Sequence, residues 1–358
     1  MTANDTIPQE MRRLVVTSSG SGSSVADCIV EVQTVPTPKP KFNEVLIKVV
    51  AAPVNPSDYG GWYRPGPTTT YPLPMGKEGC GIVVASGGMT SSFKCPIGSK
   101  VGFIISDNMQ GSYSEYVAVS ALTGAFHMPD DVPIEECASF FVNPYTAVGI
   151  LDTAERANSS RKAIVHTAAA SQLGQMLNKL AVTKDMEIIN IVRRPEQKEL
   201  LEQLGAKHII VTDGDDVETW KTELRSKVKD LGVTHAFDAV SGDMTGHILD
   251  CMPSGGTVYL YGGLAGNASG INPLDLIYRR KQLKGFLLTS WLYEGGTMRM
   301  IPRMMSASGV VNAGLAADGW ARSQFLDTTM EVAHAEIVRL LSSSSTGKKL
   351  RIRFDGVK

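Results

Sequence analysis

The hydrophobic positions of the chain follow different patterns in its two halves. From about residue 12 to 125, short runs rich in Val and Ile are separated by Gly, Pro and Ser. Closely spaced short strands of this kind are typical of a β-barrel or a partly open sandwich. The predicted strands here include EVLIKVVAAPV (44–54), GCGIVVASG (79–87), SKVGFII (99–105) and YSEYVAVS (113–120).

From about residue 160, apolar strands alternate with helices. The stretch 172–183, for example, has apolar residues at the i, i+3, i+4, i+7 spacing of an amphipathic helix. Six strands that alternate with helices need parallel crossovers, so the sequence predicts a doubly wound α/β sheet. A last β-like run, KKLRIRF (348–354), suggests that the chain then returns to the first domain. The six predicted strands are 162–170, 187–194, 208–212, 235–242, 256–266 and 283–291.

Composition and charge restrict the class of function. With 358 residues, 43% of them hydrophobic, the chain is long enough for two globular domains. A net charge of −1 without a basic run supplies no field for nucleic acid or an anionic membrane. The first residues carry Asp5 and Glu10 and lack an apolar core, which argues against a secretory signal. We expect a cytosolic protein that acts on a small molecule, without nucleic acid or membrane partners, and leave mitochondrial import open.

The stretch HTAAASQLGQ (166–175) joins the first strand of the alternating part to its first helix. A dinucleotide pyrophosphate binds at such a turn, where small side chains admit it to the N–H groups at the positive end of the helix. Gly174 fits the last glycine of the dinucleotide fingerprint, but the first two positions are not glycine, so an unrelated strand–helix turn is the alternative. The candidate cofactor residues in this turn are Ala169, Ala170, Ser171, Gln172, Leu173 and Gly174.

The second strand of the alternating part ends in Arg193 and Arg194. A sheet that prefers NADH usually places Asp or Glu there, on the ribose hydroxyls, whereas arginine suits the 2′-phosphate of NADPH. The planar guanidinium makes bidentate, charge-assisted contacts to phosphate. We therefore predict NADPH as the cofactor; two solvated arginines that only cap a strand are the alternative.

Five motifs occur in a specific order along nearly the whole chain: NPSD (55–58), GKEGCGIVVASG (76–87), FFVNPYTAVGIL (140–151), HTAAASQLGQ (166–175) and INIVRRPEQKELLEQLGAKHII (189–210). Together they resemble the medium-chain dehydrogenase/reductase superfamily, and within it the zinc-independent quinone oxidoreductases and 2-enoyl thioester reductases. The resemblance implies an α/β protein with a GroES-like β-rich catalytic domain (1–142 and 296–358) and a doubly wound Rossmann domain (143–295). It also implies a homodimer or homotetramer joined through the edges of the Rossmann sheets.

The chain departs from the zinc alcohol dehydrogenases that belong to the same superfamily. Those enzymes carry a Cys in their first loop and a His in a G-H-E motif, where this chain has the NPSD segment and Lys77. Glu78 alone cannot form a tetrahedral zinc site. The structural lobe with four cysteines is also missing, and the five dispersed cysteines are typical of reduced thiols. We therefore expect no metal.

The resemblance implies further site residues. Asn55 is expected beside the nicotinamide, and Asn143, Tyr145 and Thr146 are expected to clasp the cofactor where the two domains meet. Residues that follow the fourth, fifth and sixth strands are expected to surround the nicotinamide half, in the crevice at the carboxyl ends of the strands. These residues are Val240, Ser241, Tyr261, Gly262, Gly263, Leu264, Phe286, Leu287 and Leu288, although the last three are equally compatible with the core of a sixth strand.

Without zinc, hydride transfer to the β-carbon of an activated alkene leaves an enolate that needs a proton. A tyrosine phenol suits this role because it is protonated at pH 7. In the enoyl thioester reductases that the chain resembles, a Tyr shortly after the NPSD-like motif donates this proton; Tyr63 is the nearest match and Tyr71 competes with it. The alternative is that these aromatic side chains only line an apolar pocket.

Three functions stay open at this point. The first is NADPH-dependent transfer of hydride to a quinone, an enone or another activated alkene. The second is reduction of 2-enoyl thioesters of coenzyme A or an acyl carrier protein, for which Arg279, Arg280 and Lys281 are candidates for a basic entrance. The third, from a different class, is an NADPH-binding structural or RNA-binding protein with little turnover.

Overall fold

The computed structural model describes residues 7–105, 110–157, 162–214, 216–316, 319–342 and 347–354. The chain divides into two compact units, Met1–Val142 with Asn312–Lys358, and Asn143–Val311. The predicted domains also divide after residue 142, whereas the second predicted division, after residue 295, differs from the observed one. The observed division lies inside a single helix, α10 (Thr297–Ala316), so most of this helix belongs to the second unit.

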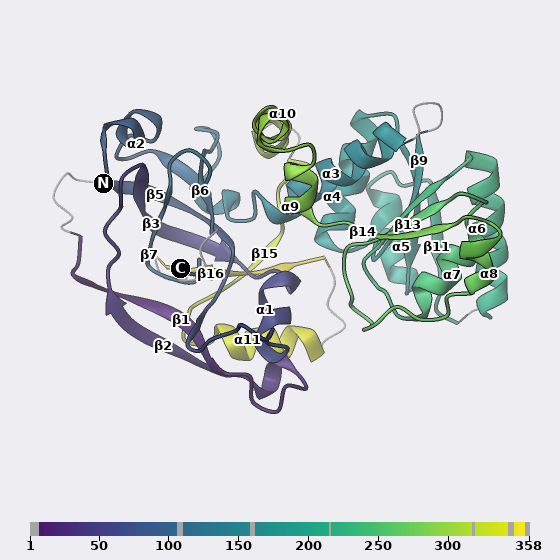
Figure 1. The fold of residues 1–358 in the computed structure, drawn as a ribbon, viewed down its shortest axis with the longest axis horizontal. Helices are drawn as coiled ribbons and strands as arrows, with labels where there is room; N and C mark the ends of the chain where they lie inside the picture. Colours follow the sequence, from purple (N-terminus) through teal and green to yellow (C-terminus); the bar gives the residue numbers. More distant parts are fainter. Residues whose placement is uncertain are drawn as a thin grey trace. The chain divides into compact units, whose positions relative to one another are not determined.

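The β-rich unit is organised around the long strand β3 (Glu44–Pro53). This strand pairs antiparallel with β5 (Glu78–Ser86) along most of its length, with β7 (Tyr116–Ser120) through its first half, and with β16 (Lys349–Arg353) through its last residues. The pairing of β16 with β3 confirms that the last β-like run returns to the first domain (Figure 1). The sheet is completed by β6 (Lys100–Ile104), β8 (Ala125–His127) and β15 (Phe325–Thr328), and a second sheet contains β1 (Glu10–Ser18), β2 (Ile29–Pro36) and β4 (Leu73–Pro74).

A short helix, α1 (Pro56–Tyr63), follows β3 directly. Pro56 stands at its first position, where the fixed backbone angle of proline suits the start of a helix. The N–H that proline lacks would have no partner within the helix at this position. The helix is held to the unit by Trp62, which is buried in a core with Tyr113 and Met75. Residues 55–63, which contain two of the predicted site residues, are therefore fixed by core packing.

The second unit contains a six-stranded parallel sheet with the strand order β11-β10-β9-β12-β13-β14 (Figure 1). The first three strands are added outward from β9 in one direction, and the last three, from β12 to β14, are added in the other. This is the strand order of a Rossmann sheet, and it confirms the predicted doubly wound fold. Helices α6 (Val217–Leu231) and α7 (Asp243–Cys251) bury apolar side chains on one face, and α4 (Gln172–Thr183) and α5 (Pro195–Gln203) pack on the other. The strands are β9 (Ala163–Thr167), β10 (Glu187–Val192), β11 (His208–Val211), β12 (His235–Asp238), β13 (Thr257–Leu260) and β14 (Gln282–Gly285).

The sixth predicted strand, 283–291, is too long. Strand β14 ends at Gly285, and α9 (Leu288–Tyr293) begins three residues later, so Phe286, Leu287 and Leu288 are not strand residues. A short continuous apolar run does not distinguish a strand from a buried helix by its periodicity, which is the reason for the error. The remaining helices are η1 (Val25–Asp27), α2 (Met89–Lys94), η2 (Ile134–Cys137), α3 (Val142–Ala157), α8 (Pro273–Ile277) and α11 (Ala333–Ser342). In the part of the chain that the structure describes, no helix has the length and apolar character needed to cross a membrane.

Candidate functional site

The turn between β9 and α4 has the shape of a phosphate cradle. Ser171 is the N-cap of α4, and its hydroxyl oxygen accepts a hydrogen bond from the N–H of Gly174 at 3.1 Å. A Cβ at Gly174 would lie 2.2 Å from the carbonyl oxygen of Ala169, so only glycine allows the helix to start this close to the turn. Ala169 and Ala170 are buried beneath the turn. The first N–H groups of α4 point out of the helix beside small side chains, which is the donor set that a pyrophosphate needs.

Arg193 and Arg194 follow β10, the strand next to β9. Their backbone N–H groups donate to the side-chain oxygen of Gln197 at 3.0 and 3.1 Å, which fixes the loop at the start of α5. Arg193 is exposed, while Arg194 is half-buried as the N-cap of α5. Arg193 is therefore an exposed cation at the carboxyl end of β10, and its contact with a 2′-phosphate stays a prediction.

Asp238 ties the ends of β9 and β12 together at the point where the strand order reverses. Its buried carboxylate accepts hydrogen bonds from the hydroxyls of Thr167 and Thr245, both at 2.7 Å, and from the N–H of Val240 at 2.9 Å. The N–H of Ser241 lies 3.3 Å from both carboxylate oxygens, and Ser241 has a left-handed backbone with φ of 64°. The sequence analysis missed Asp238, although an acidic residue at the end of an apolar strand was a visible signal.

The ends of β13 and β14 place the other predicted residues at the same edge of the sheet. A Cβ at Gly262 would lie 2.7 Å from the carbonyl oxygen of Ala239, so this glycine lets the chain pass close to the end of β12. Gly263, Leu264 and Leu287 are exposed, Phe286 is buried and Leu288 is half-buried. Since all strands are parallel, residues after β9, β10, β12, β13 and β14 gather at the carboxyl edge, where this fold binds ligands. Their contacts with a cofactor stay a prediction.

Tyr261 is engaged inside the domain. Its hydroxyl forms a hydrogen bond of 2.6 Å with Nε2 of His166, and the two rings are stacked with centroids 5.8 Å apart. Burial lowers the pKa of His166 to about 3, and burial together with the charge of Asp238 raises the pKa of Tyr261. Both side chains are therefore neutral at pH 7. Because the hydroxyl of Tyr261 is bonded to His166, Tyr261 would contact a cofactor through its backbone.

The predicted residues of α3 differ in their exposure. Asn143 is half-buried, whereas Tyr145 and Thr146 are buried. The hydroxyl of Tyr145 forms a hydrogen bond of 2.5 Å with Oγ of Ser308, and burial raises the pKa of this tyrosine to about 12. The phenol of Tyr145 is thus neutral and held by α10.

Asn55, Tyr63 and Tyr71 all lie at the ends of α1. Asn55 is its N-cap and is fully buried, with Nδ2 donating to Oε1 of Glu78 at 2.9 Å. Tyr63 is the last residue of the helix, and the guanidinium of Arg64 lies 5.1 Å from its ring centroid. The hydroxyl of Tyr71 donates a long hydrogen bond of 3.4 Å to the carbonyl of Trp62. The structure thus brings both tyrosines to the same end of α1, and their role as proton donors stays a prediction.

The residues of this chain in the segments where the zinc enzymes carry their ligands have other partners. The ammonium of Lys77 donates to the carbonyl oxygen of Ser57 at 2.9 Å, and the buried carboxylate of Glu78 accepts from Asn55 and from two backbone N–H groups. Among the described residues, no three side chains from His, Cys, Asp and Glu are grouped as a metal site would require. The five cysteines are buried and form no disulfide.

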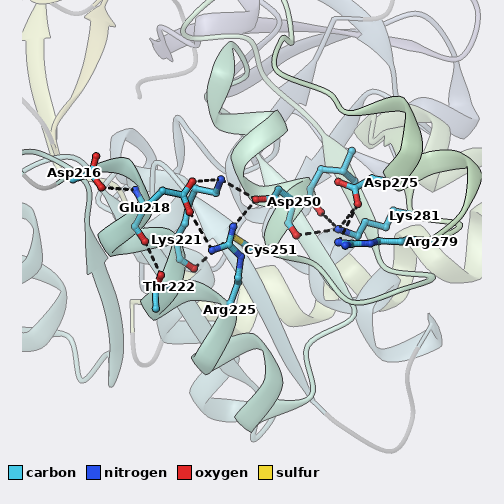
Figure 2. A network of polar contacts seen from close by, with 11 residues as sticks. Asp216, Glu218, Lys221, Thr222, Arg225, Asp250, Cys251, Asp275, Arg279 and Lys281 are labelled. Atoms are coloured by element: carbon cyan, nitrogen blue, oxygen red, sulfur yellow. Dashed lines mark hydrogen bonds and ion pairs between the residues drawn. The ribbon is translucent and has the colours of Figure 1, made fainter.

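One of the three basic residues suggested as a thioester entrance is buried. Lys281 is buried; its ammonium lies 3.0 Å from Oδ1 of Asp275 and donates to the carbonyl oxygens of Leu249 and Asp250 at the end of α7 (Figure 2). Arg279 lies 3.3 Å from the same carboxylate. These residues precede β14, so they lie at the amino edge of the sheet, opposite the phosphate cradle. Lys281 cannot take part in the suggested entrance because its buried ammonium caps α7 and pairs with Asp275, whereas Arg279 and Arg280 are exposed and their role stays a prediction.

Comparison with known proteins agrees with this geometry. Residues 41–130 match the family model "Alcohol dehydrogenase GroES-like domain", and residues 173–305 match the model "Zinc-binding dehydrogenase". The chain is 31% identical over 294 residues to the mitochondrial enoyl-[acyl-carrier-protein] reductase of Bos taurus, covering 79% of this chain and 74% of that protein. It is 30% identical to the Arabidopsis thaliana protein of the same description, covering 75% of this chain and 71% of that one.

Solved structures give the same family. A putative NADPH:quinone reductase from Mesorhizobium loti superimposes with a TM-score of 0.81 at 28% identity, over 97% of this chain and 99% of that chain. A mycobacterial protein in complex with NADPH has a TM-score of 0.78 at 21% identity, over 96% and 99% of the two chains. The chain belongs to the medium-chain dehydrogenase/reductase superfamily, in its zinc-independent branch of quinone oxidoreductases and enoyl thioester reductases. It is thus an oxidoreductase of a family that uses a nicotinamide cofactor.

Proposed function

We propose that the protein is an NADPH-dependent reductase of activated carbon–carbon double bonds, with 2-enoyl thioesters as the favoured substrates. The observation that carries the cofactor assignment is the exposed guanidinium of Arg193 at the carboxyl end of β10, next to the phosphate cradle. The thioester class is favoured over the sequence-based preference for quinones because the curated relatives at about 30% identity are enoyl-[acyl-carrier-protein] reductases.

The residues of the second unit fit a bound dinucleotide. The start of α4 offers N–H donors above Gly174, where any side chain would collide with Ala169. Arg193 supplies a planar cation for a 2′-phosphate, and no acidic side chain takes the place of Arg193 or Arg194 at the end of β10. When bound, the nicotinamide supplies the hydride. The chain's own contribution is to hold the phosphates and orient the ring at the carboxyl edge of the sheet.

The residues of the β-rich unit would complete the reaction. Addition of hydride to the β-carbon of an enoyl thioester leaves a negative charge on the thioester oxygen and a carbon that must accept a proton. Tyr63 and Tyr71, at the end of α1, carry the hydroxyl groups suited to donate it. In this proposal Tyr63 is the proton donor, and Asn55 binds beside the reacting groups.

The chemistry of the donor set favours a reaction without zinc. The superfamily's zinc enzymes use thiolate and imidazole ligands, and this chain offers the amide of Asn55 and the ammonium of Lys77 in those segments. An amide and an ammonium do not replace these ligands. In this proposal, hydrogen-bond donors and not a metal ion polarise the carbonyl group of the substrate.

A quinone is the second candidate substrate. The likeness to the putative NADPH:quinone reductase of Mesorhizobium loti covers nearly the whole of both chains. A reduced quinone takes its protons from water, so this reaction has less need of a positioned phenol. The dependence on Tyr63 thus separates the two candidates.

We infer that the protein forms a homo-oligomer through β14. This strand lies at one end of the six-stranded sheet, and an edge strand offers unpaired backbone groups to another chain. The neighbouring helix α8 and the residue after it expose Leu274, Ile277 and Tyr278. Light scattering of the purified protein tests this inference: a dimer or tetramer is expected, and a monomer at micromolar concentration would contradict it.

Steady-state turnover tests the proposed function. Purified protein is assayed with a trans-2-enoyl-CoA series and a simple quinone, with NADPH and NADH, in a strong chelator. NADPH-dependent reduction of the thioesters that survives the chelator is expected. Loss of turnover upon zinc removal would contradict the metal-free mechanism. NADPH binding without turnover of either substrate would favour a binding protein with little activity.

A further inference from the structure

The short helix α2 of the β-rich unit turns its apolar side chains toward water (Figure 1). Met89 and Phe93, one helical turn apart, are each 90% exposed. Ser91 and Cys95, which lie on the opposite face of the helix, are buried. A surface helix usually buries its apolar face and exposes its polar one, so α2 has the reverse arrangement. Such an arrangement indicates that another apolar surface covers this face.

The orientation of α2 is fixed by contacts of its inner face. The hydroxyl of Ser91 forms a hydrogen bond of 2.7 Å with that of Ser86, at the end of β5, and donates to the carbonyl oxygen of Gly88 at 2.9 Å. Cys95 is packed into the apolar core of the unit. A rotation that buried the apolar side chains would break these contacts, so their exposure is built into the fold.

Two neighbouring loops extend the exposed apolar face. The ring of Phe42, which is 76% exposed, lies against the N-cap of α2, where a new Cβ would be 3.4 Å from the ring. The exposed Leu122 accepts a hydrogen bond on its carbonyl oxygen from the ammonium of Lys94 at 2.9 Å. The N–H of Ala121 donates to the carbonyl of Asn43 at 2.9 Å, which joins the two loops. The apolar patch consists of Phe42, Met89, Phe93 and Leu122, from the segments 39–43, 87–98 and 120–124.

Lysine residues border the apolar patch. Its three segments contain Lys39, Lys41 and Lys94 and no Asp or Glu, so they carry a local charge of +3. Lys39 and Lys41 are exposed. Glu44, which follows the first segment, is half-buried, and its carboxylate accepts from the N–H of Lys41 at 2.8 Å. The net charge of −1 for the whole chain therefore hides a positive surface at this place.

This combination of residues selects among the surfaces that could cover the apolar patch. A symmetric contact between two copies of the chain would set the same three lysines against each other. Interfaces between proteins are depleted in lysine and use arginine instead. Apolar and aromatic side chains flanked by lysine are typical of surfaces that bind the headgroup region of anionic membranes.

We propose that the apolar patch and its three lysines dock the β-rich unit on an anionic membrane surface. The apolar side chains enter the boundary between headgroups and acyl chains, while the ammonium groups remain at the level of the lipid phosphates. The association is peripheral and is weakened by salt. It involves none of the residues assigned to the cofactor or to proton donation, so it does not depend on the proposed function.

Sedimentation of the full chain with lipid vesicles tests this proposal. One set of vesicles contains equimolar phosphatidylserine and phosphatidylcholine, and the other contains phosphatidylcholine alone. The protein should bind the anionic vesicles more strongly. Phe42→Ser with Phe93→Ser should weaken this binding at least about tenfold, because each ring loses its place in the bilayer. Lys39→Ala with Lys41→Ala should weaken it about fivefold for each lysine.

Two control variants remove the same kinds of side chain elsewhere. Ile29→Ser removes an exposed apolar side chain at the opposite end of β2 from the apolar patch, and Lys198→Ala removes a cation of α5. Both should bind anionic vesicles like the wild type. Thermal unfolding and NADPH titration should show that all four variants are folded and bind the cofactor normally.

Three results would overturn the proposal. The first is a wild type that does not bind anionic vesicles or binds neutral ones equally well. The second is unchanged vesicle binding in the double variant of Phe42 and Phe93. The third is a wild type that does not bind vesicles while this double variant has a smaller oligomer by light scattering, because a second copy of the chain then covers the apolar patch.

Discussion

His166 and Tyr261 are hydrogen-bonded at 2.6 Å across the intervening strand β12. His166 belongs to β9 and Tyr261 follows β13, so the pair links the two strands that flank the centre of the carboxyl edge. The imidazole is fully buried, and its Nδ1 has no partner among the described residues. The pair is therefore a neutral structural contact beneath the predicted cofactor site, and protonation would disrupt it.

The first prediction concerns stability in acid. The pKa of His166 is about 3 in the folded protein and about 6.5 when unfolded, so between these values the unfolded chain binds the extra proton. Stability should fall as the pH decreases from about 6.5 toward 3. Between about pH 7.5 and about pH 5, the wild type should lose about 2 kcal/mol more unfolding free energy than His166→Gln, measured by urea unfolding. Equal losses in the two proteins would show that His166 titrates normally.

The second prediction concerns cofactor preference. Charge-assisted bonds to phosphate contribute about 1.5–3 kcal/mol each, so Arg193→Ala with Arg194→Ala should reduce the preference for NADPH over NADH at least about tenfold. The ratio of kcat/KM for the two cofactors measures this. Lys198→Ala is the matched control, since it removes a positive charge from α5, the helix that follows the two arginines, where Lys198 faces Glu202. A double variant with wild-type discrimination would refute the assignment.

The third prediction compares two glycines within helices. Gly174→Ala drives a Cβ against the carbonyl of Ala169, so a loss of about 1–3 kcal/mol of stability is expected, with weaker NADPH binding. Gly309, in α10, has no atom within 4 Å of a new Cβ, so Gly309→Ala should stabilise the protein by up to about 1 kcal/mol. Thermal unfolding and NADPH titration measure both effects. Normal NADPH affinity in Gly174→Ala would argue against a cradle at this turn.

The fourth prediction concerns the proton donor. Tyr63→Phe keeps the ring and loses only the hydroxyl, so kcat for an enoyl thioester should fall about a hundredfold or more while NADPH affinity stays unchanged. Turnover of a quinone should fall much less. Tyr59→Phe, in the same helix, is the control, since Tyr59 packs edge-on against Trp62. If only Tyr71→Phe lowers kcat, Tyr71 is the proton donor. If neither substitution lowers kcat, neither of these tyrosines donates the proton.

The architecture was largely predictable because the period of the apolar residues differs between the two units. The runs 187–194 and 208–212 became β10 and β11 within two residues at each end, since Pro195 and Gly205 mark the ends of the helix between them. The predicted extension of the sixth strand to residue 291 was wrong because an apolar run such as Phe286, Leu287 and Leu288 is compatible with a strand and with the start of a helix. The apolar pattern alone does not separate these cases.

The contacts within the site were not predictable, because they join residues far apart in the sequence. His166 and Tyr261 are separated by 95 positions, and Glu78 and Phe141 by 63. Such pairs have no spacing that a single sequence reveals. For Lys281, adjacency in the sequence was misleading. Three adjacent basic residues suggested a basic entrance, yet the ammonium of Lys281 is buried against Asp275. A run of charges does not indicate which side chain faces water.

The destination of the hydride tests the central claim most directly. The protein is incubated with a trans-2-enoyl thioester and NADPH that carries deuterium at C4 of the nicotinamide, in separate experiments for the two C4 epimers. The account predicts a saturated thioester with one deuterium at its β-carbon, detected by mass spectrometry, for one epimer and not for the other. Consumption of NADPH without a labelled saturated product from either epimer would contradict it.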